Sequence, residues 1–112
     1  MRNMSFYLTT RAVRARTKTH TVRNGWTHAQ PGDTIRAVVK ATGLRRMQAL
    51  ETLATIRITS VERRPLQSIT TAEVTREGFP NWTTEQFISW LSQRLKCSPS
   101  LVLTFLEYEY ID

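Results

Sequence analysis

A chain of 112 residues is long enough to bury one hydrophobic core but not two, so the sequence predicts a single domain over residues 1–112 and a monomer by default. No run approaches the ~18 apolar residues that a membrane span needs, and the N-terminus lacks the apolar core of a signal peptide, so we expect a cytoplasmic setting and no membrane partner. Sixteen Lys and Arg against nine acids give a net charge of +7, which favours a nucleic-acid partner; the alternative is a charge that only maintains solubility.

The positive charge is uneven along the chain. Residues 1–30 contain no Asp or Glu, whereas residues 107–112 carry three acids and no base. Thirteen of the sixteen cations are Arg, whose planar guanidinium suits phosphate and can stack on bases. We therefore expect the polyanion-binding face in the N-terminal third.

The first half of the chain reads as short strands separated by turns. Residues 6–8 predict a first strand, and residues 10–16 predict one or two helical turns. Residues 19–23, rich in Thr and Val, predict a second strand. Residues 34–40 alternate between apolar and polar side chains, which indicates a half-buried strand. The basic segment 41–49 is expected to be a loop.

The second half predicts strands around two inserted helices. Residues 53–62 give the clearest strand pattern, with Ala54, Ile56, Ile58 and Ser60 on one face. Two capping boxes follow: residues 70–73 open a short helix that should stop at Gly78, and residues 83–86 open a second, whose apolar stripe is Phe87, Ile88, Leu91 and Leu95. Residues 101–111 should close the sheet. The pattern predicts an α+β domain built on a small mixed β-barrel with two or three short helices.

Several ordered motifs resemble those of ASCH domains, relatives of the PUA RNA-binding fold. The opening motif consists of Lys18-Thr19-x-Thr21-x-Arg23, Trp26 and Pro31-Gly32-Asp33. The later pieces are the strand of residues 54–61, the run from Leu66 through Glu73 to Arg76-Glu77-Gly78-Phe79, then Phe87 and Phe105-x-x-Tyr108. The match spans roughly residues 6–110. One departure is that Arg14, Ala15, Arg16 and Thr17 fill the place where the family usually has Gly, so we expect a differently shaped turn there.

The resemblance implies a PUA-like β-barrel with a cleft beside the strand that carries Lys18 and Thr21. Members of the family are linked to RNA binding, and others have been proposed as ribonucleases. Small bacterial members are similar to amidohydrolases that remove acetyl from N4-acetylcytidine with a Lys, a Thr and a Glu. Carried onto this sequence, those residues are Lys18, Thr21 and Glu77.

The chemistry of this set can be argued from its functional groups. Thr21 would attack the acyl carbonyl, and a backbone N–H near it would hold the oxyanion. Lys18 could accept the hydroxyl proton if burial among cationic neighbours lowered its pKa. Glu77 could protonate the leaving N4 or position a water. Since residues three apart in a strand point to opposite faces, Lys18 must lie in the preceding turn or in a bulge to reach Thr21.

Flanking residues are expected to bind the nucleoside or RNA, and each candidate also has a structural reading. The binding candidates are Arg14, Arg16, Thr19, Arg23 and Trp26. Structural readings are a phosphate contact for Lys18, an ordinary strand hydroxyl for Thr21, a helix end or an Arg23 partner for Glu77, and a lid on the core for Trp26. His20 and His28 lack metal-ligand spacing, so we expect neither a metal nor another cofactor.

Three functions follow as hypotheses. The first is a hydrolase that acts on an amide such as that of N4-acetylcytidine. The second is a non-catalytic RNA-binding module whose affinity falls with salt. The third is a metal-independent ribonuclease. The resemblance favours a cleft for RNA or a modified nucleoside, and it implies amide hydrolysis as the leading activity.

Overall fold

The structure is a computed structural model that describes residues 1–40 and 50–112. The loop expected at 41–49 lies outside the described residues. The strands are β1 (Arg2–Ser5), β2 (His20–Arg23), β3 (Thr34–Val38), β4 (Thr52–Pro65) and β5 (Val102–Tyr110). The helices are α1 (Thr10–Arg14), α2 (Thr71–Arg76) and α3 (Thr84–Leu95), with 3₁₀ turns at Tyr7–Thr9 and Leu66–Ser68.

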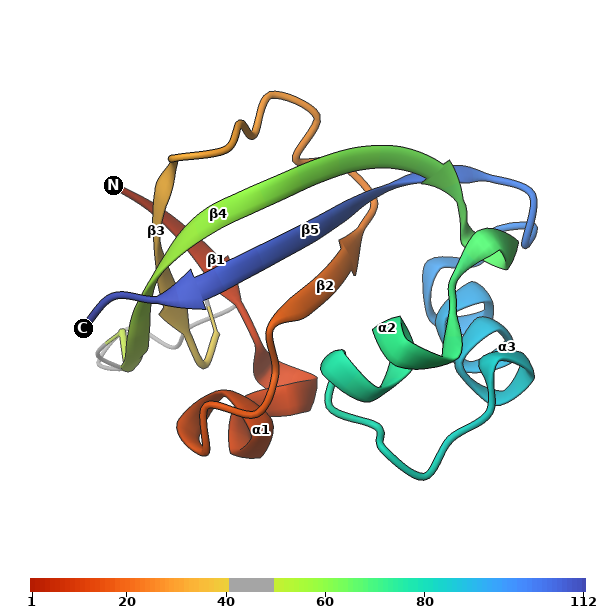
Figure 1. The fold of residues 1–112 in the computed structure, drawn as a ribbon, viewed down its shortest axis with the longest axis horizontal. Coiled ribbons are helices and arrows are strands. Elements are labelled where there is room, and N and C mark those ends of the chain that lie inside the picture. Colours follow the sequence, from red (N-terminus) through yellow and green to blue (C-terminus); the bar gives the residue numbers. More distant parts are fainter. Residues whose placement is uncertain (41–49) are drawn as a thin grey trace.

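The five strands form one curled sheet in the order β1-β3-β4-β5-β2 (Figure 1). β1 runs parallel to β3, and the other neighbouring pairs are antiparallel. The long strands β4 and β5 arch across the molecule, and α2 and α3 lie together to the right of β2 in this view. The sheet is therefore a half-barrel whose edge strands are β1 and β2, which confirms the predicted α+β fold class.

The predicted first strand is wrong in its position. The strand is Arg2–Ser5, paired with residues 35–38 of β3, and residues 7–9 instead form a 3₁₀ turn. Phe6 is the last residue held by the ladder, through its N–H to the Val38 carbonyl, and the Thr10 hydroxyl then donates to the Phe6 carbonyl. Aromatic residues are common in strands, which suggested a strand at 6–8. The backbone turns away from β3 after Phe6, so residues 7–9 have no neighbouring strand to pair with.

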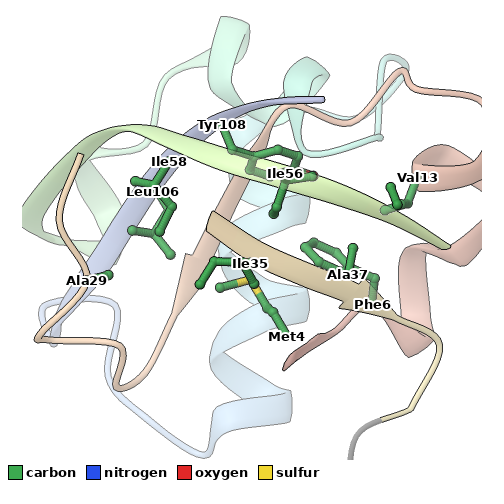
Figure 2. Close-up of a cluster of buried hydrophobic side chains, with 11 residues drawn as sticks. Met4, Phe6, Val13, Ala29, Ile35, Ala37, Ile56, Ile58, Leu106 and Tyr108 are labelled. Carbon is green, nitrogen blue, oxygen red and sulfur yellow. The ribbon is translucent and has the colours of Figure 1, made fainter. Parts of the chain in front are cut away.

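Two apolar clusters form the core. The first packs inside the half-barrel, with Phe6 and Val13 closing one end (Figure 2). The second joins β2 and β5 to α2 and α3. Ala54, Ile56 and Ile58 are buried on one face of β4, as the alternation predicts. Ser60 departs from that face because the register shifts between it and Ile58, where a bulge bends the strand.

The two predicted helices after β4 are confirmed with their caps. Thr70 and Glu73 make both bonds of a capping box at α2, and Thr83 and Gln86 do the same at α3. α2 ends at Arg76, and Gly78 follows its C-cap residue Glu77 with a φ of 107°, a left-handed conformation that glycine adopts without steric cost. The Thr19 N–H donates to the Arg76 carbonyl at 2.9 Å, which ties the end of α2 to the segment that leads into β2. In the described parts of the chain, no helix has the length and apolar character to cross a membrane.

Candidate functional site

A cavity of about 400 Å³ opens between the two edges of the half-barrel. One wall is the end of β1 with the turn that follows, another is β2, and α3 forms a third. Its lining residues are Ser5, Phe6, Tyr7, Leu8, Thr9, Lys18, Thr21, Val22, Arg23, Asn24, Trp26, Glu77, Trp90, Leu91, Arg94 and Leu95. Five of the residues singled out in the sequence therefore line one cavity, and these are Lys18, Thr21, Arg23, Trp26 and Glu77.

Lys18 lies in the turn that leads into β2, where the geometry of a strand required it to lie. Arg16 has a φ of 61°, in the left-handed region that favours glycine. The N–H groups of Thr17 and Lys18 both point to the Ala12 carbonyl, at 3.0 and 3.4 Å. The Tyr110 hydroxyl donates to the Lys18 carbonyl. The turn is thus held from both sides, and it directs the Lys18 amine inward.

The Lys18 amine is buried against Glu77. Its Nζ donates to the Glu77 backbone carbonyl at 2.8 Å and lies 3.4 Å from Glu77 Oε1. The two side chains are only 3% and 5% exposed. Burial lowers the pKa of the Lys18 amine; the Glu77 carboxylate opposes this effect, and the positive charge of Arg23 adds to it. The outcome is an amine that gives up its proton more readily than an ordinary lysine.

The Thr21 hydroxyl is held by Arg23. Arg23 Nε donates to Thr21 Oγ1 at 3.0 Å, and an Nη donates to the Ser5 carbonyl on β1 at 2.6 Å. The guanidinium also lies 4.9 Å from the centre of the Phe6 ring. Burial lowers the pKa of Arg23, and Glu77 counteracts that effect. Arg23 therefore joins the two edge strands and fixes the hydroxyl that faces the cavity.

Behind these groups lies a buried chain of charges that the sequence did not reveal. His20 is 1% exposed, with Nδ1 at 3.4 Å from Glu77 Oε2 and Nε2 at 3.5 Å from Glu73 Oε2. Arg64 donates twice to Glu73, at 2.8 and 3.0 Å. Burial raises the pKa of Glu73, but the bonds from Arg64 and from the Thr70 N–H outweigh it and hold that pKa at about 2. Glu73 showed itself in the sequence only as a capping-box residue.

Three of the predicted binding residues lie outside the cavity lining. Arg14 pairs with Glu51 at 2.9 Å, and Arg16 pairs with Asp112 at 3.2 Å. Thr19 accepts a bond from the Tyr108 N–H through its carbonyl, within the sheet. Trp26 lies at the rim, half-buried, with the Arg2 guanidinium 4.7 Å from its ring centre.

The wall supplied by α3 was also missed. Trp90, Leu91, Arg94 and Leu95 line the cavity from a helix that the apolar stripe assigned to the core. The Arg94 guanidinium lies 5.5 Å from the Trp90 ring centre, and the Trp90 ring in turn contacts Phe79. The one sequence signal that Trp90 lines the cavity is its position next to the apolar stripe of α3. Within residues 1–40 and 50–112, no group of three His, Cys, Asp or Glu side chains has a metal-binding arrangement.

Comparison with known proteins identifies the fold. No protein-family model and no curated protein matches the chain. Protein EF3133 from Enterococcus faecalis V583, of the DUF984 family, has a TM-score of 0.71 at 18% identity, over 100% of this chain and 77% of that one. An ASCH domain from Lactobacillus crispatus JV V101 has a TM-score of 0.57 at 13% identity, over 92% and 70%. The hypothetical protein PH0355 has a TM-score of 0.63 at 11% identity, over 97% and 95%.

These similarities establish an ASCH-like fold for the chain. The identities of 11–18% carry the fold and not an activity. The expected α+β, PUA-like fold is therefore confirmed, with the sheet curled into a half-barrel, whereas any activity has to be argued from the residues that line the cavity.

Proposed function

We propose that this protein binds a modified nucleoside in its cavity and hydrolyses an amide on the base, with N4-acetylcytidine as the representative substrate. One observation carries the proposal: a lysine–glutamate pair less than a tenth exposed lines the same cavity as Thr21. A buried ion pair is weak support for stability, because desolvation offsets its attraction. Perturbed, buried titratable groups in a cleft are instead typical of functional sites.

The acylation step can be written with these groups. Thr21 Oγ attacks the acyl carbon, and its proton passes to the Lys18 amine, whose lowered pKa suits it to act as the base. The bond from Arg23 Nε favours the negative charge that develops on Thr21 Oγ. The C–N4 bond then breaks, and the departing nitrogen takes up a proton. Water finally cleaves the acyl-threonine, giving a carboxylic acid and the free amine.

A donor for the oxyanion is available on the open edge of β2. The Tyr108 N–H bonds to the Thr19 carbonyl, and Thr21 is the register partner of Leu106. In an antiparallel ladder the backbone groups of alternate residues point to opposite edges. The N–H of Val22 therefore points away from β5, toward the side on which the cavity lies, and we assign it to the oxyanion.

The shape of the cavity supports a single nucleoside more than a length of RNA. Its volume of about 400 Å³ falls in the usual range for small-molecule sites. Trp26 and Trp90 offer faces on which a base can stack. Arg14 and Arg16, which would otherwise extend a basic surface, are neutralised by Glu51 and Asp112.

The test is incubation with N4-acetylcytidine and a panel of N4-acylated cytidines, followed by chromatography. We expect release of cytidine by the wild type and by Thr21→Ser. Thr21→Val should reduce the rate to background with the thermal midpoint unchanged. Thr52→Val, an exposed threonine on β4, is the matched control and should keep full activity.

Two results would replace the proposal with another function. If none of the acylated cytidines is hydrolysed and RNA binds with strong salt dependence, the protein is a binding module. If labelled RNA shortens in the presence of a chelator, it is a metal-independent ribonuclease. Equal turnover by Thr21→Val and the wild type would remove Thr21 from the mechanism.

A further inference from the structure

His20 lies between two buried carboxylates, one on each side of its ring. Its Nε2 faces Glu73 and its Nδ1 faces Glu77, at 3.5 and 3.4 Å, and all three side chains are less than a tenth exposed. The Phe105 ring packs at its edge, with centroids 5.8 Å apart. The register partner on β5, Glu107, is 42% exposed and turns to Arg76 at 3.8 Å. Glu73 and Glu77 are thus the titratable groups that face the imidazole directly.

Glu73 fixes one hydrogen on the imidazole. Its carboxylate accepts two bonds from Arg64 and one from the Thr70 N–H, so it is ionised at neutral pH. An ionised oxygen facing a ring nitrogen requires a hydrogen on that nitrogen, because two lone pairs repel. His20 Nε2 therefore carries a hydrogen, much as the aspartate of a catalytic triad fixes the tautomer of its histidine.

The other side of the ring needs a second proton. His20 Nδ1 and Glu77 Oε2 are both buried and lack hydrogen-bond partners within the described part of the chain, yet they lie 3.4 Å apart. A neutral imidazole beside an ionised Glu77 would leave two buried lone pairs facing each other, which is costly. One proton between them satisfies both atoms, whether it is bound to Nδ1 or to Oε2.

We propose that His20 and Glu77 hold a stored proton, which Glu77 delivers to the leaving amine. His20 is then a positioning residue, because it acts on the substrate only through its contact with Glu77. The delivery rests on the proposed amide hydrolysis, whereas the storage rests on the geometry alone.

The His20–Glu77 pair donates this proton during acylation and takes up another during deacylation, so it returns to its starting state in each catalytic cycle. In acylation Lys18 takes the proton of Thr21, while Glu77 gives the stored proton to N4 as the C–N4 bond breaks. In deacylation water loses a proton to the His20–Glu77 pair, and Lys18 returns its proton to Thr21 Oγ. The sum is amide plus water to carboxylic acid plus amine.

Nuclear magnetic resonance tests the storage directly. The chain has two histidines, so His28→Gln leaves His20 as the single imidazole for ¹⁵N labelling. At pH 7 we expect a hydrogen on Nε2, together with either a hydrogen on Nδ1 or a protonated Glu77 carboxyl in the ¹³C spectrum. In Glu77→Gln, His20 should become a neutral ring with a hydrogen on Nε2 only. A bare Nδ1 beside an ionised Glu77 in the wild type would overturn the proposal.

Kinetics tests the delivery. For His20→Gln we expect kcat on N4-acetylcytidine to fall by about 100-fold with KM unchanged, since general acid catalysis is typically worth 10²–10⁴. The burst rate of nitrophenolate release from p-nitrophenyl acetate, which reports acylation alone, should stay within twofold, because nitrophenolate leaves without a proton. Glu107→Gln, which removes the other carboxylate on this face, is the control and should not change either rate.

The outcomes separate the two proposals. An equal loss on both substrates would mean that His20 is merely structural and would overturn the delivery. If His20→Gln does not fold, His20→Asn and the two-substrate comparison decide in its place. If the wild type hydrolyses neither substrate, the proposed function fails, and the resonance measurement still decides whether the proton is stored.

Discussion

Glu73 offers a quantitative test of the buried charges behind the cavity. The perturbation is Glu73→Gln, which keeps the size of the side chain and removes its charge. In the wild type the carboxylate is 7% exposed, accepts two bonds from Arg64 and caps α2 through the Thr70 N–H. The variant should therefore lose charge-assisted bonds that no solvent can replace.

The size of the effect follows from the pKa of Glu73. Its value of about 2 lies below the ordinary value of 4.5, so the folded state releases this proton more readily than the unfolded state. Stabilisation from the ionised carboxylate is complete above pH 4.5 and is lost as the pH falls toward 2. A shift of this size corresponds to roughly 3 kcal/mol of unfolding free energy, at 1.36 kcal/mol for each pH unit.

Urea denaturation followed by tryptophan fluorescence measures this difference. We expect Glu73→Gln to be less stable than the wild type by roughly 3 kcal/mol at pH 7, and the deficit should vanish near pH 2. Glu109→Gln breaks an exposed pair with Arg57, so it should cost under about 1 kcal/mol at each pH. A deficit that stays constant between pH 7 and pH 2 would refute the reasoning.

Three other predictions concern the turn after α2 and Lys18, the proposed catalytic base. Gly78→Ala should lower the unfolding free energy, measured by the same denaturation, by about 1–3 kcal/mol. The reason is that φ of Gly78 is 107° and the new Cβ would lie 3.0 Å from the Ala12 Cβ. An unchanged denaturation midpoint would mean that the turn can relax. The pH–rate profile of the hydrolysis should rise with pH with a midpoint below 10.5, because Lys18 acts as a base only after losing its proton and burial lowers its pKa. Lys18→Arg should be inactive at every pH, since a guanidinium keeps its proton, and activity in that variant would exclude Lys18 as the base.

Local signals in the sequence predicted most of the elements. Capping boxes mark helix starts by a side chain bonding three residues away, and alternation marks strands, so both are readable without the fold. The sequence did not predict β1, because residues 2–5 are mostly polar and form a strand through pairing with the parallel strand β3. Pairing between segments thirty residues apart leaves no local pattern.

The candidate site was predictable only in part. Alternation along β2 placed His20 opposite Thr21, but its partners come from α2 and are more than fifty residues away. Arg14 and Arg16 looked like anion-binding groups because neighbouring acids in sequence are absent. Their acids arrive from distant segments at Glu51 and Asp112. Formal charge along a chain therefore does not report which cations stay available after folding.

The open side of the half-barrel has a consequence for how the protein resists unfolding. β1 and β2 each have one hydrogen-bonded neighbour in the sheet, and the Arg23–Ser5 bond spans the gap between them. A ligand in the cavity contacts both strands and so takes part in closing the wall. At a hundred times its Kd, such a ligand would add about 2.7 kcal/mol to the unfolding free energy. Amide hydrogens of the two edge strands should then be the ones whose exchange slows most.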